Sequence, residues 1–395
     1  MFGRDIYSTL ETHLVKRQVT VITGMRRVGK STAVKHLFTK APQKTKLYLD
    51  CERIEVRTLL NRSNYEEIKE ELELLGIVFD KPSLIALDEI QLVENLPSLI
   101  KYLYDTYGVK FIVTGSSSYY MKNTFSESLA GRKKIFELYP LSFKEFLVFK
   151  KQWASAFARY QWQPFKAPWY KRVNGLYKEY IDYGGFPEVV LQKRVSDKKD
   201  LLHDIINSYI ELDVKLLSDY AAGEELYKLV KLLAARSGNK TDYSKISNIS
   251  GLNRQKVASY IQLLEQTYLV YQLSPFTKNI DREISQQKKL YFSDTGILNV
   301  LAGNQLSSGQ VFENAVAAQL KSLGDLQYYQ KKTGQEIDFI FNGETAIEAK
   351  ETPATHDLGT LSQRAAALQI KKRLLVGCHQ PPVTFDEFIW AGAIW

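Results

Sequence analysis

A loop with two glycines between an apolar strand and a helix is the feature that most limits how this 395-residue chain can fold. The stretch VTVITGMRRVGKSTAVKHL, residues 19–37, runs from an apolar segment into Gly24 and continues after Lys30 with apolar residues at helical spacing. Gly24 and Gly29 let successive backbone amides converge on one anion, and the following helix adds its positive N-terminal end. A triphosphate fits that concavity, with Lys30 reaching its β and γ phosphates and the Ser31 hydroxyl ligating Mg²⁺. The spacing GxxxxGK(S/T) therefore predicts a nucleotide site.

A pair of carboxylates after the next apolar segment supports the same site. PSLIALDEIQLV, residues 82–93, reads as a buried strand that ends in Asp88 and Glu89. In phosphoryl transfer, one such acid holds Mg²⁺ and the other polarises the attacking water. A later strand, VKFIVTGSSS, ends in Thr114 and Ser116. Either residue can orient the water, although Ser and Thr at strand ends also serve as turn formers, and an acid pair can simply be exposed at a strand end.

These segments resemble the AAA class of ATPases. More narrowly, the chain resembles the prokaryotic AAA-type ATPases, often grouped with the signalling NTPases, that carry a winged helix and a nuclease-like domain of unknown function. The resemblance rests on GMRRVGKS, LDEIQ, VTGSSS, LAGR, PLSFKEF, GGFPEV, KLYFSDTGI and EIDFIF…AIEAK, which follow in the family's order. It implies that the chain binds ATP and Mg²⁺ and hydrolyses ATP.

The resemblance also implies roles for individual residues. Lys30, Asp88 and Glu89 would be catalytic, and Ser31 and Asp88 would hold the Mg²⁺. The nucleotide-binding segment would consist of Gly24, Met25, Arg26, Arg27, Val28, Gly29, Lys30, Ser31 and Thr32.

Two further roles follow from the resemblance. Thr114 or Ser116 would sense the γ phosphate, and Arg132 would be an arginine finger. A finger that acts on a neighbour's nucleotide requires a homo-oligomer. The alternative is that Arg132 is a surface cation beside Lys133 and Lys134.

Composition bounds the class of protein. No apolar run approaches the length of a bilayer crossing, and MFGRDIYSTL lacks the pattern of a secretion signal, so we expect a cytoplasmic protein with no membrane partner. Cys51 and Cys378 lie far apart, which indicates neither a disulfide framework nor a cysteine metal site.

The net charge of +9 is concentrated in residues 121–180, which contain twelve Lys or Arg against four Glu. Within this window, KKQWASAFARYQWQPFKAPWYKR interleaves cations with aromatic residues, a pattern that can grip phosphates and stack on bases. The alternative is a helical subdomain whose aromatics form a core and whose cations face solvent.

The middle of the chain predicts a winged helix. Helical segments at 224–238 and 243–250 precede a third segment that Asn253 can cap and that leads into a strand. The third helix exposes Arg254, Gln255, Lys256 and Ser259, which could enter a DNA major groove. The competing interpretation is that this module only couples the ATPase to the C-terminal domain.

Four residues with ionisable side chains lie at suggestive positions near the C-terminus. Glu313 lies on the apolar face of a helix, Asp338 alternates with apolar residues in EIDFIF, and Glu348 and Lys350 share one face of AIEAK. Carboxylates that converge at a sheet edge are costly to bury unless a cation joins them, and Mg²⁺ suits hard oxygen ligands. This pattern therefore predicts a metal site.

The same pattern resembles the PD-(D/E)xK restriction-endonuclease-like superfamily. By that resemblance Asp338 and Glu348 hold Mg²⁺, and Glu313, Asp338, Glu348 and Lys350 carry phosphodiester cleavage. The superfamily also contains members that act only as binding modules.

We therefore expect an α/β protein with a P-loop NTPase parallel sheet, a helical lid, a winged helix and a C-terminal restriction-endonuclease-like α/β domain. The expected boundaries are 1–140, 141–220, 221–285 and 286–395. The leading interpretation is a Mg²⁺-dependent AAA-type ATPase coupled to a DNA-binding, and in the fullest case DNA-cleaving, C-terminal half. The alternative is a non-cleaving, ATP-dependent regulatory switch that binds a protein or nucleic acid partner.

Overall fold

The computed structural model describes residues 2–115, 129–214, 223–277, 279, 281, 285–331, 334–383 and 385–395. The candidate sensor Ser116 lies outside the described residues. The chain divides into two compact units. The N-terminal unit comprises residues 1–139 and 266–268, and the C-terminal unit comprises residues 140–265 and 269–395.

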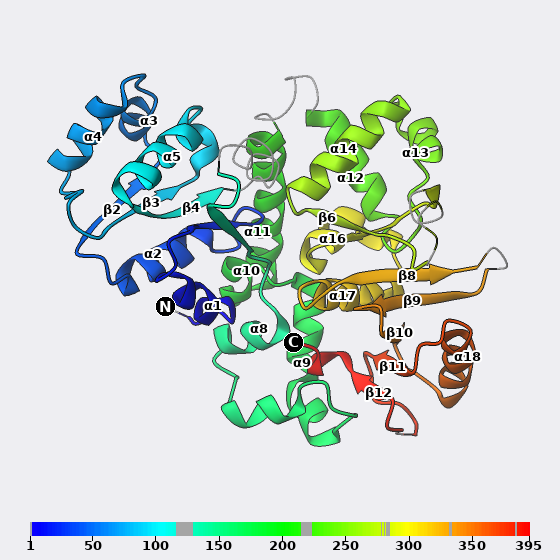
Figure 1. Ribbon diagram of the computed structural model, residues 1–395. Helices are drawn as coiled ribbons and strands as arrows, with labels where there is room; N and C mark the ends of the chain where they lie inside the picture. Colours follow the sequence, from blue (N-terminus) through cyan, green and yellow to red (C-terminus); the bar gives the residue numbers. More distant parts are fainter. Residues whose placement is uncertain are drawn as a thin grey trace. The chain divides into compact units, whose positions relative to one another are not determined.

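A five-stranded parallel sheet organises the N-terminal unit (Figure 1). Its strands, in the spatial order β2-β3-β4-β1-β5, are β2 (Thr45–Asp50), β3 (Ser83–Asp88), β4 (Lys110–Gly115), β1 (Val19–Thr23) and β5 (Lys133–Glu137). Strands β1, β3 and β4 are buried along their whole length, which agrees with their continuous apolar runs. The parallel α/β sheet predicted from the glycine loop is therefore confirmed.

Helices cover both faces of this sheet (Figure 1). One face carries α1 (Ile6–His13) and α2 (Lys30–Lys40), and the other carries α3 (Ile54–Leu60), α4 (Tyr65–Leu74) and α5 (Leu96–Tyr107). Because all five strands are parallel, their carboxyl ends lie at one edge of the sheet, and β4 separates β1 from β3 at that edge.

Helices make up the first half of the C-terminal unit. They are α8 (Phe143–Phe149), α9 (Ala167–Tyr183), α10 (Pro187–Leu191), α11 (Val195–Ser208), α12 (Gly223–Ala234), α13 (Tyr243–Ser250) and α14 (Arg254–Gln266). After α14 come the antiparallel strands β6 (Val270–Leu273) and β7 (Lys289–Phe292), followed by α16 (Thr295–Ala302) and α17 (Ser308–Lys321). The order of three helices followed by a strand in residues 223–273 agrees with the order that we expected there, and the second strand, β7, was not predicted.

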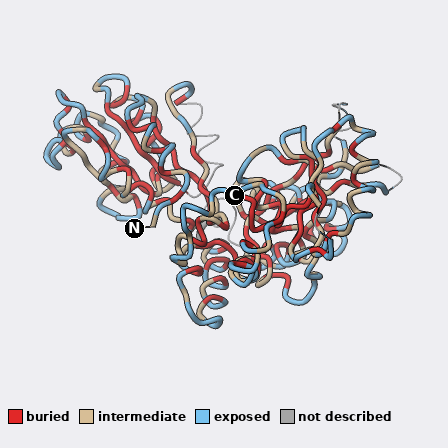
Figure 2. The backbone as a smooth tube through the Cα atoms, turned by 90° about the horizontal axis from the view of Figure 1, so that it is seen from below, coloured by how far each residue is buried: buried red, intermediate tan, exposed pale blue. Residues whose placement is uncertain are grey.

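A second five-stranded sheet, of mixed direction, occupies the rest of the C-terminal unit. In the spatial order β12-β11-β10-β9-β8, its strands are β12 (Phe388–Trp390), β11 (Lys372–Gly377), β10 (Thr345–Lys350), β9 (Glu336–Phe341) and β8 (Leu326–Gln330). Strands β8, β9 and β10 pair antiparallel, whereas β10, β11 and β12 pair parallel. Two clusters of buried apolar side chains lie in the described part of this unit. Helix α17 contributes to the larger cluster, and α18 (Thr355–Ala366) forms the smaller one together with β9, β10 and β11. Figure 2 shows these buried segments along the strands of each unit.

The loop YGGFPEVV closes around a buried carboxylate. Asp294 caps the N-terminus of α16 by accepting the Ile297 N–H at 3.0 Å, and it also accepts the Gly185 N–H at 2.7 Å. Gly184 has a φ of 74°, and a Cβ atom there would lie 2.1 Å from the Asp294 carboxylate. Gly184 is therefore required by the close approach of this carboxylate, and Gly185 by the Leu141 carbonyl oxygen, which would lie 2.5 Å from an added Cβ atom.

The basic and aromatic window at residues 150–172 forms part of the C-terminal unit's core. Trp169 is 2% exposed, and its indole N–H donates to the Gly392 carbonyl at 3.3 Å. Trp162 stacks on Phe341 with 5.7 Å between ring centroids, and Phe165 stacks on Phe388 at 5.3 Å. These aromatic side chains pack against the C-terminal sheet, as the core interpretation of the window predicts.

Candidate functional site

The glycine loop between β1 and α2 is held in a conformation that few sequences tolerate. Gly24, Arg27 and Gly29 have φ values of 148°, 61° and 101°. The Leu138 N–H donates to the Thr23 carbonyl at 2.7 Å, so the backbone after β5 passes directly beside the loop. A Cβ atom on Gly24 would lie 2.1 Å from the Leu138 carbonyl oxygen. Glycine is therefore required at position 24 by both conformation and space.

Arg4 fixes the loop from the side. Its guanidinium donates to the Val28 carbonyl through Nη1 and to the Tyr139 carbonyl through Nη2, each at 2.9 Å. Arg4 is 9% exposed, so these contacts are largely shielded from water. Sequence reasoning missed this residue, because nothing local distinguishes an arginine twenty residues upstream of the loop.

Lys30 begins α2 and is 4% exposed. Its ammonium donates to the Met25 carbonyl within the loop at 3.1 Å and lies 3.9 Å from the Glu89 carboxylate. Ser31 and Thr32 follow in the first turn of α2, half-buried and exposed respectively. The remaining loop residues Met25 and Val28 are buried, and Arg26 lies 3.9 Å from Glu52.

Asp88 ends β3 and is 3% exposed. One carboxylate oxygen accepts the Tyr48 hydroxyl at 2.7 Å, and the other accepts the Thr114 hydroxyl. Burial and the neighbouring Asp88 carboxylate raise the pKa of Tyr48 well above its usual value, so this hydroxyl remains a donor. Sequence reasoning missed Tyr48, although its place on β2 beside β3 follows from the sheet order.

Thr114 also connects the two acids. Its oxygen accepts the Glu89 N–H at 3.0 Å while its hydroxyl donates to Asp88. Glu89 has a φ of 51° and accepts the Gln91 amide at 2.6 Å. Strand β4 lies between β3 and β1, so Thr114 lies between the acid pair and the strand that enters the loop.

Arg132 lies at the other end of the sheet. It precedes β5, whose first residue Lys133 pairs with Val19 at the start of β1, and its guanidinium forms two bonds to Asp105 at 2.9 and 3.1 Å. The length of β1, about 13 Å, separates this position from the glycine loop. Arg132 therefore cannot act on a nucleotide in its own chain's loop, and the finger role stays a prediction that requires a second copy.

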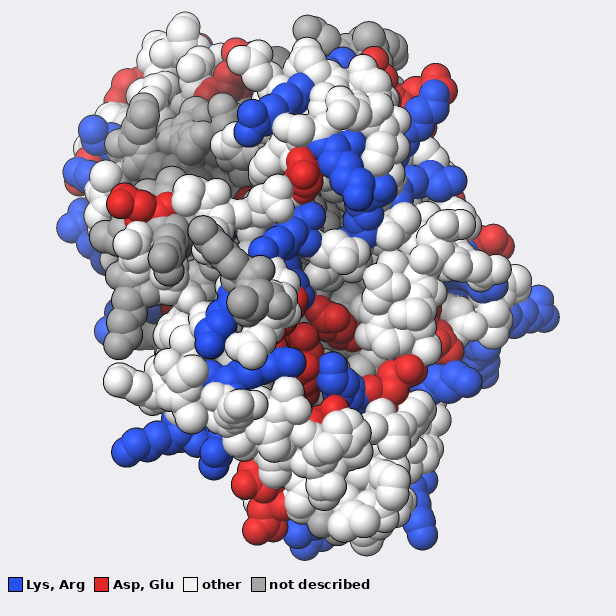
Figure 3. Space-filling model, turned by 90° about the vertical axis from the view of Figure 1, so that its right-hand side faces the viewer, with Lys and Arg blue, Asp and Glu red and all other residues white. Residues whose placement is uncertain are grey.

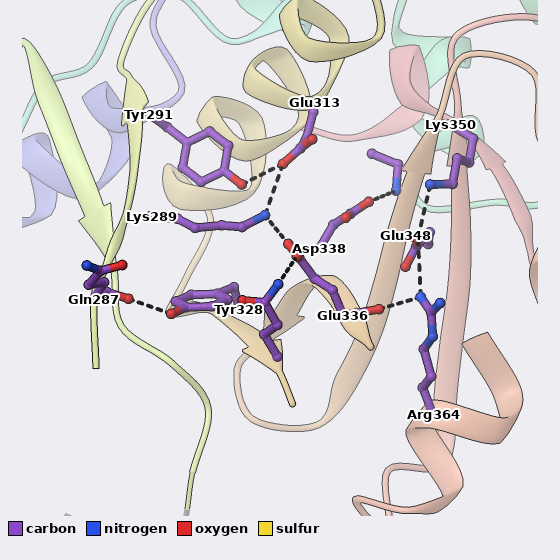
Figure 4. A network of polar contacts seen from close by, with 12 residues as sticks. Gln287, Lys289, Tyr291, Glu313, Tyr328, Glu336, Asp338, Glu348, Lys350 and Arg364 are labelled. Atoms are coloured by element: carbon purple, nitrogen blue, oxygen red, sulfur yellow. Dashed lines mark hydrogen bonds and ion pairs between the residues drawn. The ribbon is translucent and has the colours of Figure 1, made fainter. Parts of the chain in front are cut away.

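The four C-terminal residues predicted from sequence come together around β9 and β10 (Figure 4). Asp338 on β9 accepts the Ala349 N–H at 2.9 Å, and Lys350 lies 3.0 Å from one oxygen of Glu348. The other oxygen, Oε2 of Glu348, is buried and has no hydrogen-bond partner among the residues that the structure describes. Glu313 enters from α17. On the face shown in Figure 3, acidic side chains gather in a hollow that lysine and arginine side chains border.

The acids perturb one another. Burial, followed by the charges of Glu348 and Glu313, raises the pKa of Asp338 well above its usual range. Across the described parts of the chain, no group of three or more His, Cys, Asp or Glu side chains lies close enough to hold a metal ion. The donors that fit a hard cation are thus the pair Asp338 and Glu348, including the unpartnered Oε2 oxygen, and Mg²⁺ often uses one or two carboxylates with water.

Two cations that sequence reasoning did not assign, Lys289 and Arg364, share this site. Lys289 on β7 contacts Glu336 and lies 3.6 Å from Glu313, Tyr291 donates to Glu313 at 2.7 Å, and Arg364 on α18 lies 3.8 Å from Glu348. Lys350, which the sequence predicted for this site on the same strand face as Glu348, is a third cation here. The motif KLYFSDTGI contains Lys289 and Tyr291, but nothing in its spacing indicates a partner on a distant helix.

The third helix of the 223–292 segment presents polar residues. Arg254, Gln255 and Ser259 are exposed, whereas Lys256 is half-buried and contacts Glu225. The groove-binding role predicted for this face stays a prediction. Within the described residues, no helix is both long enough and apolar enough to cross a bilayer.

Comparisons with known proteins cover most of the chain in three segments. Residues 16–147 match the family described as AAA domain, residues 174–308 match a domain of unknown function (DUF8612), and residues 308–394 match another (DUF4143). An uncharacterized protein of Methanocaldococcus jannaschii is 29% identical over 87% of this chain and 76% of its own length. One from Haemophilus influenzae is 26% identical over 82% of this chain and 79% of its own length.

Two solved structures show a distant likeness to this chain. The Aeropyrum pernix ORC1 protein in complex with DNA is 13% identical, with a TM-score of 0.33, over 77% of this chain and 93% of that one. The Thermotoga maritima RuvB Holliday junction branch migration motor is 14% identical, with a TM-score of 0.33, over 68% and 89%. Such low scores support no argument about function. From the family match and the sheet that carries the glycine loop, residues 16–147 form an AAA-type P-loop domain.

Proposed function

We propose that the N-terminal unit binds and hydrolyses ATP with Mg²⁺. The observation that carries this proposal is the convergence of four groups at one sheet edge: the strained glycine loop, the buried Lys30, and the acids Asp88 and Glu89. Both Asp88 oxygens already accept hydrogen bonds, but from neutral hydroxyls, and within the described residues no cation contacts the carboxylate directly. A buried carboxylate with neutral partners suits a cation that arrives with a ligand.

Each residue has a defined task in this proposal. The loop amides and the N-terminus of α2 bind the phosphates, and Lys30 neutralises their charge. Ser31 and Asp88 would hold Mg²⁺, which when bound neutralises charge on the phosphate oxygens. Glu89 orients the attacking water, and Thr114 fixes Glu89 relative to Asp88 through its two hydrogen bonds. Arg4 keeps the loop in place from outside.

Steady-state ATP hydrolysis tests this proposal. Lys30→Ala should abolish ATP binding and turnover, whereas Lys40→Ala, at an exposed position of the same helix, should leave both unchanged. Normal hydrolysis by the Lys30→Ala protein would refute the assignment.

We propose further that the C-terminal unit binds DNA and cleaves it at the β9–β10 site. Asp338 and Glu348 would hold Mg²⁺, which supplies Lewis-acid and nucleophile-activating chemistry to phosphodiester hydrolysis. Lys350 would stabilise the charge that develops on the phosphate. Support comes from the proximity of Asp338, Glu348 and Lys350, and from the buried, unpartnered Oε2 oxygen of Glu348. The helices α12–α14 and strands β6–β7, in the order of a winged helix, would contribute DNA contacts through Arg254, Gln255 and Ser259.

Incubation with single-stranded, duplex and branched DNA in Mg²⁺ or Mn²⁺ tests cleavage. Wild-type protein should cut at least one substrate, Asp338→Asn should not, and Asp325→Asn, which changes an exposed acid of the same unit, should behave as wild type. Absence of cleavage on every substrate would leave DNA binding alone.

A non-cleaving switch is the second candidate function. The observation that favours it is the pairing of Glu313 and Glu336 with Lys289, which leaves two carboxylates rather than three for a metal ion. In this case ATP turnover would be slow, independent of protein concentration and unaffected by DNA.

If Arg132 instead acts between copies in a homo-oligomer, ATP turnover per chain should depend on protein concentration and rise with it. Mixing Lys30→Ala with Arg132→Ala protein should then restore part of the activity that each lacks.

A further inference from the structure

Lys289 brings a positive charge into the acidic site from an element outside the C-terminal sheet. It is the first residue of β7, which pairs with β6, and only 6% of it is exposed. Its ammonium contacts Glu336 on β9 and lies 3.6 Å from Glu313 on α17 (Figure 4). The side chain therefore joins three separate elements at one buried point.

The partners of Lys289 are themselves held in place. Tyr291, two residues further along the same strand, donates to the same Glu313 oxygen at 2.7 Å. Gln330 donates to the other oxygen of Glu336 at 2.9 Å. Both carboxylates therefore have fixed positions around the ammonium, and the contact with Lys289 is not a mobile surface ion pair.

The cations divide the acidic site into two parts. Lys289 forms ion pairs with Glu313 and Glu336, whereas Lys350 and Arg364 both lie close to Glu348. Asp338 lies between the two parts and bonds to the Ala349 amide. The oxygen without a partner, Oε2 of Glu348, belongs to the part that Lys289 does not reach.

Two divalent ions in one hydrolytic site lie about 3.5–4 Å apart and need carboxylates on both sides. Here the carboxylates that would serve a second ion are already bound to an ammonium group. A buried ammonium between two carboxylates supplies positive charge at a fixed position without binding a metal.

We propose that Lys289 is a built-in cation that takes the place of a second metal ion, so that the acidic site accepts a single divalent ion, at Asp338 and Glu348. This inference rests on the proposed metal site and deepens it. It also makes β7 part of the site, because a change in the position of that strand would move the ammonium away from Glu313 and Glu336.

Equilibrium dialysis of Mn²⁺ without nucleotide tests the proposal on the full chain. An Asp88→Asn background removes the main carboxylate of the N-terminal site. In that background we expect about one bound ion per chain with Lys289 present and about two in Lys289→Met. Lys289→Arg keeps the charge and should bind about one. Lys289→Met should also show a lower Tm without metal and a larger rise in Tm with Mn²⁺ than its parent.

The outcomes separate this inference from the proposed function. One ion in the parent, lost on Asp338→Asn, together with one ion in a folded Lys289→Met protein would overturn the role of Lys289 alone. No ion in either protein would overturn both. If Lys289→Met does not fold, Glu313→Gln provides the test. We expect its Mn²⁺ affinity to be unchanged, because Glu313 pairs with Lys289 and does not bind the metal ion. A tenfold or greater loss of Mn²⁺ affinity would show instead that Glu313 is a metal ligand.

Discussion

The two acidic sites of this protein differ in what compensates their negative charge. At the end of β3, Asp88 accepts hydrogen bonds from the neutral hydroxyls of Tyr48 and Thr114. Around β9 and β10, the carboxylates instead meet Lys289, Lys350 and Arg364. Under the proposed function, Asp88 would therefore depend on a cation that a ligand brings, whereas the C-terminal site carries most of its own cations.

The sites also differ in what holds their geometry. The N-terminal site depends on backbone shape, since three loop residues have positive φ and the loop is bounded by the Leu138 carbonyl. The C-terminal site is built from side chains on regular strands and one helix, so its geometry depends on side-chain packing and charge. Substitutions should therefore damage the first site through the backbone and the second through electrostatics.

The largest effect is expected for Glu89→Gln. If this carboxylate orients and polarises the attacking water, its loss should lower ATP turnover on the order of 10²–10⁴-fold with ATP affinity retained. Turnover and nucleotide binding should be measured beside Glu94→Gln, which changes an exposed acid of the same unit and should have no effect. Equal turnover in wild type and Glu89→Gln would show that the acid pair acts only through Asp88.

Gly24→Ala tests the dependence on backbone shape. The new Cβ would meet the Leu138 carbonyl at 2.1 Å at a φ of 148°, so we expect a loss of roughly 3 kcal/mol or more in the free energy of unfolding. Urea denaturation measures it. Gly76→Ala is the matched control, because its φ is 101° and nothing lies within 4 Å of the added atom. A loss no larger than in the control would mean that the loop relaxes and that its shape is not fixed.

Local patterns in the sequence predicted the parts of these sites that lie within one segment. The glycine spacing located the loop, and the alternation in EIDFIF and AIEAK located Asp338, Glu348 and Lys350. The partners that set the electrostatics were missed, since Arg4, Tyr48 and Lys289 come from elements 24, 40 and at least 24 residues away from the groups they contact. Such contacts depend on strand order and helix packing, which periodicity does not specify. The aromatic window was open to two interpretations for the same reason, because its packing partners lie at the C-terminus.

Asp294 offers a third kind of compensation, by backbone amides alone, and predicts a pH effect. Burial raises the pKa of Asp294 to about 6, although hydrogen bonds from the Gly185 and Ile297 amides favour the charged form and act in the opposite direction. A raised folded-state pKa means that the folded state binds more protons between pH 3.8 and about 6. The stability from this group is complete below pH 3.8 and is lost as the pH rises through about 6.

The measurement compares wild type with Asp294→Asn by urea denaturation between pH 3.5 and 7.5. Other groups titrate in both proteins, so the difference isolates Asp294. The stability of wild type relative to the variant should fall by about 3 kcal/mol as the pH rises across this range. A flat difference would show that the amide donors offset the burial completely.

The smallest effect is expected for Tyr48→Phe, which removes one neutral donor from Asp88. A hydrogen bond to a charged group contributes about 1.5–3 kcal/mol, and the buried carboxylate would lose half of its compensation. Tyr102→Phe is the matched control, because its hydroxyl also donates to a carboxylate, Glu66, but at an exposed position where we expect a change below about 0.5 kcal/mol. In the absence of nucleotide Tyr48→Phe should therefore unfold at lower urea concentration than either wild type or Tyr102→Phe. Mg²⁺ and ATP should narrow that gap, since a bound cation replaces the lost donor as the partner of Asp88. If nucleotide leaves this difference in urea stability unchanged, Asp88 does not depend on a ligand for its compensating charge. The proposed difference between the two acidic sites would then be wrong for the N-terminal site.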